Sequence, residues 1–281
     1  MSGDRVRRNT LRSSALRVLS PAAGAIIFGM DLSRPLRPEQ RDEIVARLID
    51  HHVLVFPDQR LTREEQFAFA AHFGEVEAHG AHRGEAKRYG VAHVMTNLDA
   101  EGRPAIRRSP AANYHWHTDK PYLPAPPMLT MLHAVEVPPR GGDTEFANTA
   151  LAYEALSEPM QRRIAGLRVA FTPAFESDPA RRTVVDHPLV RTHPDTGEKA
   201  LYLGNHATHI VGMPEAEGRA LLAELLAHAT QRRFVYRHHW REGDLVVWDN
   251  RCLLHRLVLD EGLGRYRRVM HRSIVTGTVP V

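Results

Sequence analysis

Several features that define other classes of protein are missing from this sequence of 281 residues. It has one cysteine, Cys252, so it cannot form an intrachain disulfide, and nothing points to an oxidising compartment. No apolar run approaches the ~20 residues that a membrane-spanning helix needs, which excludes a transmembrane protein. The chain has no internal repeat and no Pro/Ser-rich linker. It also lacks a P-loop, a G-x-G-x-x-G motif and a Ser-His-Asp order, so kinase, dehydrogenase and hydrolase functions have no support. We therefore expect a globular cytoplasmic protein.

The excess of positive charge is confined to the N-terminus. The formal net charge is +4, from 37 basic and 33 acidic residues, and five of the arginines but only one acid, Asp4, lie in residues 1–20. The rest of the chain is neutral, so it has no electrostatic signature of nucleic-acid binding. We expect residues 1–17 to form a disordered basic tail and residues 18–281 to form one domain, with no nucleic-acid or membrane partner.

The order of the predicted elements indicates the fold class. Residues 39–50 have helical apolar spacing, a buried strand runs from Val53 to the stop at Pro57, and Thr62 with Glu65 forms a capping box that starts a second helix. After about residue 125 come many short β-like stretches separated by Pro/Gly/Asp turns, interrupted by two helices at about 149–166 and 214–230. Many strands with few crossover helices predict a β-sandwich or jelly roll with appended α-helices.

The segment N-Y-H-W-H-T-D at 113–119 is the strongest chemical signal. On an extended strand His117 and Asp119 would point the same way, about 6.6 Å apart along the chain. A distant histidine, His255, follows a strongly apolar strand. Two histidines and one carboxylate make the facial triad of non-haem Fe(II) oxygenases, which leaves coordination positions open for other ligands.

Each part of this pattern has an alternative interpretation. An H-x-D pair arises readily by chance among 18 histidines, and His115 on the same strand face as His117 permits a cupin-like H-x-H site, although no matching Glu stands at cupin spacing. Arg268 and Arg272 share one face of the last predicted strand. Their guanidinium groups suit recognition of carboxylates, but arginines on a strand are also common at a solvated edge.

Four motifs together resemble one family, the Fe(II)- and 2-oxoglutarate-dependent dioxygenases of the TauD/TfdA group. The motifs are WHTD at 116–119, GGDTEFAN at 141–148, WDNRCLLHR at 248–256 and RRVMHR at 267–272. They occur in the family's order, and the similarity extends from about residue 18 to 277. The fold that this resemblance implies is mainly β with helices: a double-stranded β-helix (jelly roll) core with appended α-helices.

The resemblance also implies a set of site residues. His117, Asp119 and His255 would be the catalytic ligands of Fe(II), while Thr144 and Arg268 would hold 2-oxoglutarate, with O2 as the other cosubstrate. The stretch between His255 and Arg268 is about two residues longer than in close relatives, so Arg267 or Arg265 remains an alternative to Arg268.

The substrate is expected to be a small organic acid. The C-terminal half is most similar to the aryloxyacetate branch of the family, typified by 2,4-dichlorophenoxyacetate dioxygenase. Hydroxylation beside the ether oxygen there releases a phenol and glyoxylate, with succinate and CO2 as coproducts, in aryloxyalkanoate catabolism. Arg272 matches a position near the anionic group of the substrate.

Other substrates and other functions stay open. His79, His82 and Asn113 match polar substrate contacts of sulfonate-using relatives, which keeps taurine, alkylsulfonates and alkyl sulfates as alternatives. A non-catalytic metal-binding jelly-roll protein and a zinc hydrolase on a cupin scaffold are the alternatives from other classes. By analogy with relatives, we expect a homo-oligomer.

Overall fold

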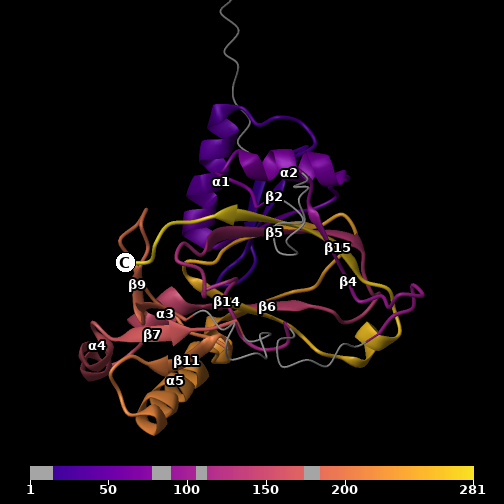
Figure 1. Ribbon diagram of the computed structural model, residues 1–281. Helices are drawn as coiled ribbons and strands as arrows, with labels where there is room; N and C mark the ends of the chain where they lie inside the picture. Colours follow the sequence, from indigo (N-terminus) through magenta and orange to yellow (C-terminus); the bar gives the residue numbers. More distant parts are fainter. Residues whose placement is uncertain (1–14, 78–89, 106–112, 174–183) are drawn as a thin grey trace, which may run out of the picture.

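A seven-stranded sheet forms one wall of the protein in the computed structural model, which describes residues 15–77, 90–105, 113–173 and 184–281 (Figure 1). The strand order is β1–β2–β3–β13–β5–β15–β4, and all neighbours are antiparallel except β2 and β3. The strands are β1 (Ala15–Val18), β2 (Ala25–Phe28), β3 (Val53–Phe56), β4 (His93–Thr96), β5 (Pro127–Glu136), β13 (Leu245–Asp249) and β15 (Val269–Thr276).

A three-stranded sheet, β12–β6–β14, forms the opposite wall. Its strands are β6 (Thr144–Asn148), β12 (Val235–His238) and β14 (Leu253–Leu257). Paired positions Tyr236, Phe146 and His255 lie in one row across it. Tyr236 and Phe146 belong to the buried cluster between the walls, and the ring of His255 is 6.2 Å from that of Phe146. Strand alternation thus directs His255 inward.

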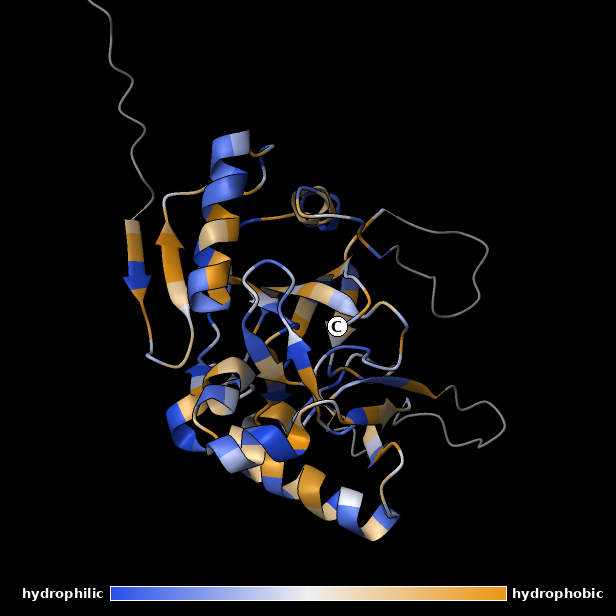
Figure 2. Cartoon of the chain, turned by 90° about the vertical axis from the view of Figure 1, so that its left-hand side faces the viewer, coloured by the Kyte–Doolittle hydropathy of each residue, from blue (hydrophilic) through white to orange (hydrophobic). Residues whose placement is uncertain are grey.

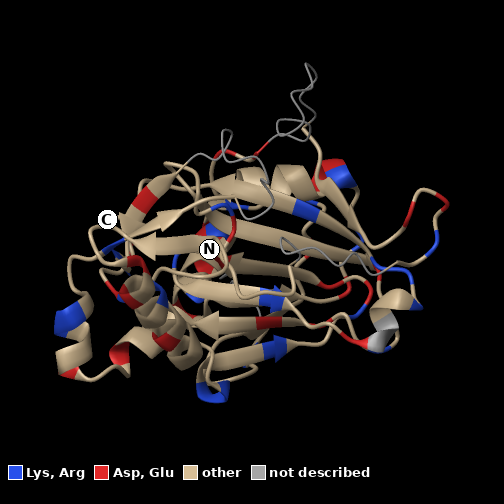
Figure 3. Ribbon diagram, turned by 60° about the horizontal axis from the view of Figure 1, so that its bottom comes forward, with Lys and Arg blue, Asp and Glu red and all other residues tan. Residues whose placement is uncertain are grey.

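The next row of this sheet carries charges and faces outward. Arg237, Glu145 and Arg256 are register partners, and Arg256 Nε donates to Glu145 Oε2 at 2.8 Å. Figure 3 shows this row as blue, red and blue on three neighbouring strands. A sheet with one apolar and one charged face is typical of an antiparallel sheet that covers a core on one side only.

The central strands of the large sheet are buried on both faces. In β3, Val53 and Val55 pack between the two walls, whereas Leu54 and Phe56 pack under the N-terminal helices. This double burial explains why the strand reads as a continuous apolar run. The helices over the outer face are α1 (Pro38–His51) and α2 (Arg63–Ala71) (Figure 1). Figure 2 shows that they carry both hydrophobic and hydrophilic residues.

A second group of helices packs beside smaller sheets on the other wall (Figure 1). These helices are α3 (Thr149–Glu154), α4 (Glu158–Ile164) and α5 (Glu215–Ala229). The remaining strands are β7 (Arg168–Phe171), β8 (Val185–Pro188), β9 (Val190–Thr192), β10 (Lys199–Leu201) and β11 (Ala207–Ile210), and two 3-10 turns are η3 (Arg232–Phe234) and η4 (Glu261–Gly264). The predicted jelly-roll core with appended helices is confirmed.

Local predictions were right at the caps and wrong at two boundaries. The Thr62 side chain accepts from Glu65 N at 3.1 Å, so the capping box is present. The single helix predicted at 149–166 is two helices, because Ser157 caps a new one and Pro159 has no N–H to continue the old one. Residues 15–17 belong to β1 and not to the predicted basic tail.

No helix in the described ranges combines the length and apolar content that crossing a membrane requires.

Candidate metal centre

Three predicted ligands converge at the inner face of the small sheet. The ligand atoms of His117, Asp119 and His255 all lie within 4.8 Å of one another, and all three residues are buried. His255 Nε2 is 3.9 Å from Asp119 Oδ2. The structure therefore brings together residues from two distant parts of the chain.

The backbone that positions these ligands differs from the prediction. Residues 113–119 do not form a strand, so the expected strand alternation was wrong. His117 instead makes an isolated antiparallel bridge with His255 in β14. His117 N donates to His255 O at 3.0 Å and His255 N donates to His117 O at 2.7 Å. This bridge sets the two imidazole centroids 4.1 Å apart.

Hydrogen bonding selects the nitrogen of His117 that faces the centre. Its Nδ1 lies 2.8 Å from the carbonyl oxygen of His115, so the Nδ1–H donates there and Nε2 keeps its lone pair. His115 contributes only this carbonyl to the site, and its exposed ring lies outside the cluster. The cupin-like H-x-H arrangement is therefore not what the chain forms.

The protonation states suit a metal ion. Burial lowers the pKa of His117, and burial together with His117 lowers the pKa of His255 to about 3, so both rings are neutral at neutral pH. Burial opposes ionisation of Asp119, but His255, Arg272, His117 and a hydrogen bond outweigh it and lower its pKa to about 2. Two neutral imidazoles and one carboxylate are the donor set of the facial triad, so these residues fit the metal.

A hydrogen-bond chain that the sequence analysis missed fixes the carboxylate. Thr130 Oγ1 donates to Asp119 Oδ2 at 2.6 Å, Asn250 Nδ2 donates to Thr130 Oγ1 at 2.9 Å, and Trp248 Nε1 donates to Asn250 Oδ1 at 3.0 Å. Thr130 is fully buried in the middle of the apolar strand β5. A polar residue inside such a run was the signal that could have identified it.

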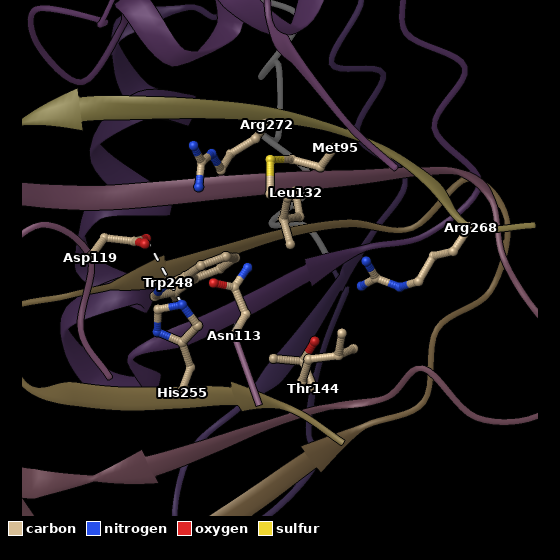
Figure 4. A pocket seen from close by; sticks show the side chains of 10 residues that line it. Met95, Asn113, Asp119, Leu132, Thr144, Trp248, His255, Arg268 and Arg272 are labelled. Atoms are coloured by element: carbon tan, nitrogen blue, oxygen red, sulfur yellow. Dashed lines mark ion pairs between the residues drawn. The ribbon is translucent and has the colours of Figure 1, made fainter. Parts of the chain in front are cut away.

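A pocket lined by two of the ligands, Asp119 and His255, lies between the two walls (Figure 4). Its lining consists of Met95, Asn113, Asp119, Leu132, Thr144, Trp248, His255, Leu257, Arg268 and Arg272. In Figure 4 the guanidinium groups of both arginines point into it, Arg272 above the metal ligands and Arg268 toward Thr144. The Nε atoms of both arginines are buried and have no hydrogen-bond partner among the described residues. Two such cations in one pocket suit anionic ligands.

Arg268 is the one of three candidate arginines that reaches the pocket. Arg267 is exposed, with its Nε 2.9 Å from Glu136 Oε1, and Arg265 is also exposed. Burial lowers the pKa of Arg268 to about 10, so its guanidinium is still charged at neutral pH. Of the predicted substrate contacts, Asn113 and Arg272 line the pocket, whereas His79 and His82 lie outside the described residues.

Comparisons with known proteins agree over nearly the whole chain. The family model described as "Taurine catabolism dioxygenase TauD, TfdA family" matches residues 15–273, which include every residue of the metal cluster and the pocket lining. An alpha-ketoglutarate-dependent 2,4-dichlorophenoxyacetate dioxygenase of Cupriavidus pinatubonensis is 41% identical over 257 residues, 85% of this chain and 90% of that protein.

Two further relatives extend the comparison. An alpha-ketoglutarate-dependent sulfate ester dioxygenase of Pseudomonas putida is 34% identical, with 92% of this chain and 88% of that protein covered. The crystal structure of AAD-2 in complex with Mn(II) and N-oxalylglycine has a TM-score of 0.84 and 35% identity to this chain, and covers 95% of this chain and 98% of its own.

Proposed function

Because this chain belongs to the TauD/TfdA family of dioxygenases, we propose that it hydroxylates an aryloxyacetate-type acid, such as 2,4-dichlorophenoxyacetate, with Fe(II) as its metal. It is a dioxygenase that uses 2-oxoglutarate, O2 and a metal ion and acts on a small molecule. When bound, the metal with 2-oxoglutarate and O2 supplies an oxidative decarboxylation that yields succinate and CO2 and drives hydroxylation of a C–H bond.

The metal-binding role falls to His117, Asp119 and His255. The carbonyl of His115 holds the His117 ring by its Nδ1–H, and the Thr130 hydroxyl holds one carboxylate oxygen of Asp119. These partners keep the two side chains in place, so the donor set does not rearrange when the metal enters. The open coordination positions of such a triad leave room for the cosubstrate.

The two arginines divide the anionic ligands between them. Arg268 and Thr144 lie together at one end of the pocket and would bind the distal carboxylate of 2-oxoglutarate, while Arg272, beside the metal ligands, would bind the carboxylate of the organic substrate (Figure 4). N-oxalylglycine, present in the AAD-2 structure, has the carbon skeleton of 2-oxoglutarate with NH replacing one CH2, which supports a cosubstrate site of this shape. Asn113 supplies a further polar contact.

The observation that carries the choice of substrate is the 41% identity to the 2,4-dichlorophenoxyacetate dioxygenase over nine-tenths of that protein. An aryloxyacetate needs one cation for its carboxylate and apolar surface for its ring. Arg272 provides the cation, and Met95, Leu132 and Leu257 line the same pocket. Hydroxylation of the carbon between ether oxygen and carboxylate gives a hemiacetal that separates into a phenol and glyoxylate.

An alkyl sulfate or sulfonate, taurine included, is the second candidate substrate. The Pseudomonas putida relative that is a sulfate ester dioxygenase covers 92% of this chain, and Asn113 lines the pocket as expected for a polar contact to such a group. A sulfate ester also needs a guanidinium partner, so Arg272 serves either candidate.

The test is succinate formation from 2-oxoglutarate by purified protein with Fe(II), ascorbate and O2, across aryloxyacetates, aryloxypropionates, taurine, alkylsulfonates and alkyl sulfates. We expect the greatest stimulation by an aryloxyacetate, with a phenol as coproduct, and no stimulation in Asp119→Ala. Greatest stimulation by a sulfate or sulfonate would overturn the proposed substrate but not the enzyme class. A protein that binds iron yet forms no succinate with any compound would favour the non-catalytic alternative.

Three expectations from the sequence stand as proposals alongside this one: a single domain, which starts with β1 at residue 15 and not at residue 18 as predicted, a cytoplasmic location, and a homo-oligomeric state. Light scattering coupled to gel filtration tests the last of them, and a mass of one chain, 31.7 kDa, would refute it.

A further inference from the structure

Trp240 contacts both residues that are proposed to hold 2-oxoglutarate, although it does not line the pocket itself. Its indole Nε1 donates to Thr144 Oγ1 at 3.0 Å. The guanidinium carbon of Arg268 lies 5.9 Å from the centroid of its ring. We infer that Trp240 is a positioning residue for 2-oxoglutarate, acting through Thr144 and Arg268. This inference rests on the proposed cosubstrate site.

The hydrogen bond from Trp240 determines the direction in which the Thr144 hydroxyl can donate. An indole N–H can only donate, whereas a hydroxyl donates once and accepts twice. Thr144 must therefore accept from Trp240, and its own proton stays available for an acceptor. Thr144 lines the pocket, so that proton can serve a carboxylate there. Without the indole N–H, the hydroxyl would be free to rotate and would have to be ordered when the ligand binds.

The contact with Arg268 acts on a charge that is otherwise poorly satisfied. The Arg268 Nε is buried and has no hydrogen-bond partner among the described residues. The face of an indole attracts a cation within about 6 Å of its centroid. Trp240 therefore holds the guanidinium by its apolar side without using any N–H that a carboxylate needs.

Trp240 is itself fixed from behind. Its ring meets that of His238 edge-on at 4.6 Å and 89°, and the Tyr236 hydroxyl lies 3.0 Å from His238 Nδ1. Trp240 is only 8% exposed and belongs to the core cluster between the two walls. A rigid aromatic support of this kind can transmit position to the side chains that it touches.

The test is a double-mutant cycle on Trp240→Phe and Thr144→Val, with 2-oxoglutarate binding to the Mn(II)-loaded protein measured by calorimetry. Phe keeps an aromatic ring on the side of Arg268 but removes the N–H together with part of the indole, so the comparison between the two backgrounds isolates the effect of the hydrogen bond. A buried hydrogen bond is worth about a kcal/mol, so we expect Trp240→Phe to weaken 2-oxoglutarate about fivefold. In the Thr144→Val background the same change should have no further effect. Equal losses in both backgrounds would overturn the role assigned to Thr144, because the loss would then not depend on the hydrogen bond from Trp240 to that hydroxyl.

A second readout separates positioning from loss of structure. The KM for 2-oxoglutarate should rise in Trp240→Phe, while the KM for the organic substrate and the affinity for Mn(II) stay within twofold of wild type. Cys252→Ala is the matched control, since it removes a polar contact, from Sγ to His52 Nδ1, from the same core cluster without touching Thr144, Arg268 or the residues behind Trp240. An equal loss of 2-oxoglutarate affinity in this control would refute the specific role of Trp240. If the wild-type protein fails to bind 2-oxoglutarate, the proposed function fails, which is a different result.

Discussion

Replacing Thr130 with Val removes one hydroxyl from the chain behind Asp119 and leaves the shape of the side chain nearly unchanged. Asp119 Oδ2 loses its donor at 2.6 Å, and Asn250 Nδ2 loses its acceptor at 2.9 Å. Thr130 and Asn250 are both almost completely buried, so water cannot easily replace the lost contacts. The substitution therefore tests whether the chain holds the carboxylate in position for the metal.

The magnitude follows from the kind of hydrogen bond that is lost. A bond from a hydroxyl to a buried carboxylate is charge-assisted and is worth about 1.5–3 kcal/mol. At about 1.4 kcal/mol for each tenfold change in affinity, the metal should bind roughly 10- to 100-fold more weakly. The unsatisfied Asn250 amide should cost about 1–3 kcal/mol of unfolding free energy as well.

Metal affinity is measured by titrating the apoprotein with Mn(II) and with Fe(II) without oxygen, and stability by urea unfolding of the same apoprotein. Thr130→Ser is the control, because it keeps the hydroxyl and loses only a methyl group. We expect near wild-type metal affinity in the Ser variant and the full loss in the Val variant. Metal affinity within twofold of wild type in Thr130→Val would refute the reasoning, whatever the change in stability.

Four other substitutions test the remaining assignments and one buried ion pair. His255→Ala should abolish substrate-stimulated succinate formation with little change in the circular dichroism spectrum, and wild-type activity in this variant would contradict the triad. Arg268→Ala should mainly raise the KM for 2-oxoglutarate and Arg272→Ala mainly the KM for the organic substrate, each by tenfold or more if a charge-assisted pair is lost; interchanged effects would reverse the two roles. Asp249→Asn breaks a buried ion pair with Arg251, at 2.6 Å, and should cost about 3 kcal/mol of unfolding free energy at pH 7. Burial opposes ionisation of Asp249, but hydrogen bonds from neighbouring side chains hold its pKa well below the ordinary 3.8. The stabilisation that the ionised carboxylate gives to the folded protein is therefore present above about pH 4 and is lost as the pH falls further. Urea unfolding between pH 3 and 7 should therefore show that the unfolding free energy falls less with decreasing pH in Asp249→Asn than in wild type. The same pH dependence of the unfolding free energy in both proteins would contradict this.

Sequence reasoning was most successful where a pattern depends on local chemistry. Thr62 and Glu65 are three residues apart, and their capping box forms as predicted because a helix start needs only those side chains and the adjacent backbone. The buried strand from Val53 was equally clear, since burial on both faces leaves an unbroken apolar run.

The site was predictable as a set of residues but not as a geometry. Spacing alone placed His117 and Asp119 on a strand, whereas the structure has a single bridge to His255, a pairing between distant segments that local periodicity cannot reveal. The motifs included Asn250 and the apolar run included Thr130, but their joint action on Asp119 depends on β5 lying beside β13 in the sheet. Trp240 was missed for the same reason, because its contact with Thr144 joins the segment just after β12 to the start of β6.

The bridge between His117 and His255 also bears on how metal binding is related to folding. Two reciprocal backbone hydrogen bonds, at 3.0 Å and 2.7 Å, join the two proposed ligands through main-chain atoms. Joining two distant segments is therefore an entropic cost of folding the sheet and not of binding the metal. In a zinc finger, by contrast, the ion itself assembles the ligands and the apoprotein is unfolded. Here main-chain pairing joins two of the proposed ligands, so we expect the protein to keep its fold when a chelator removes the metal.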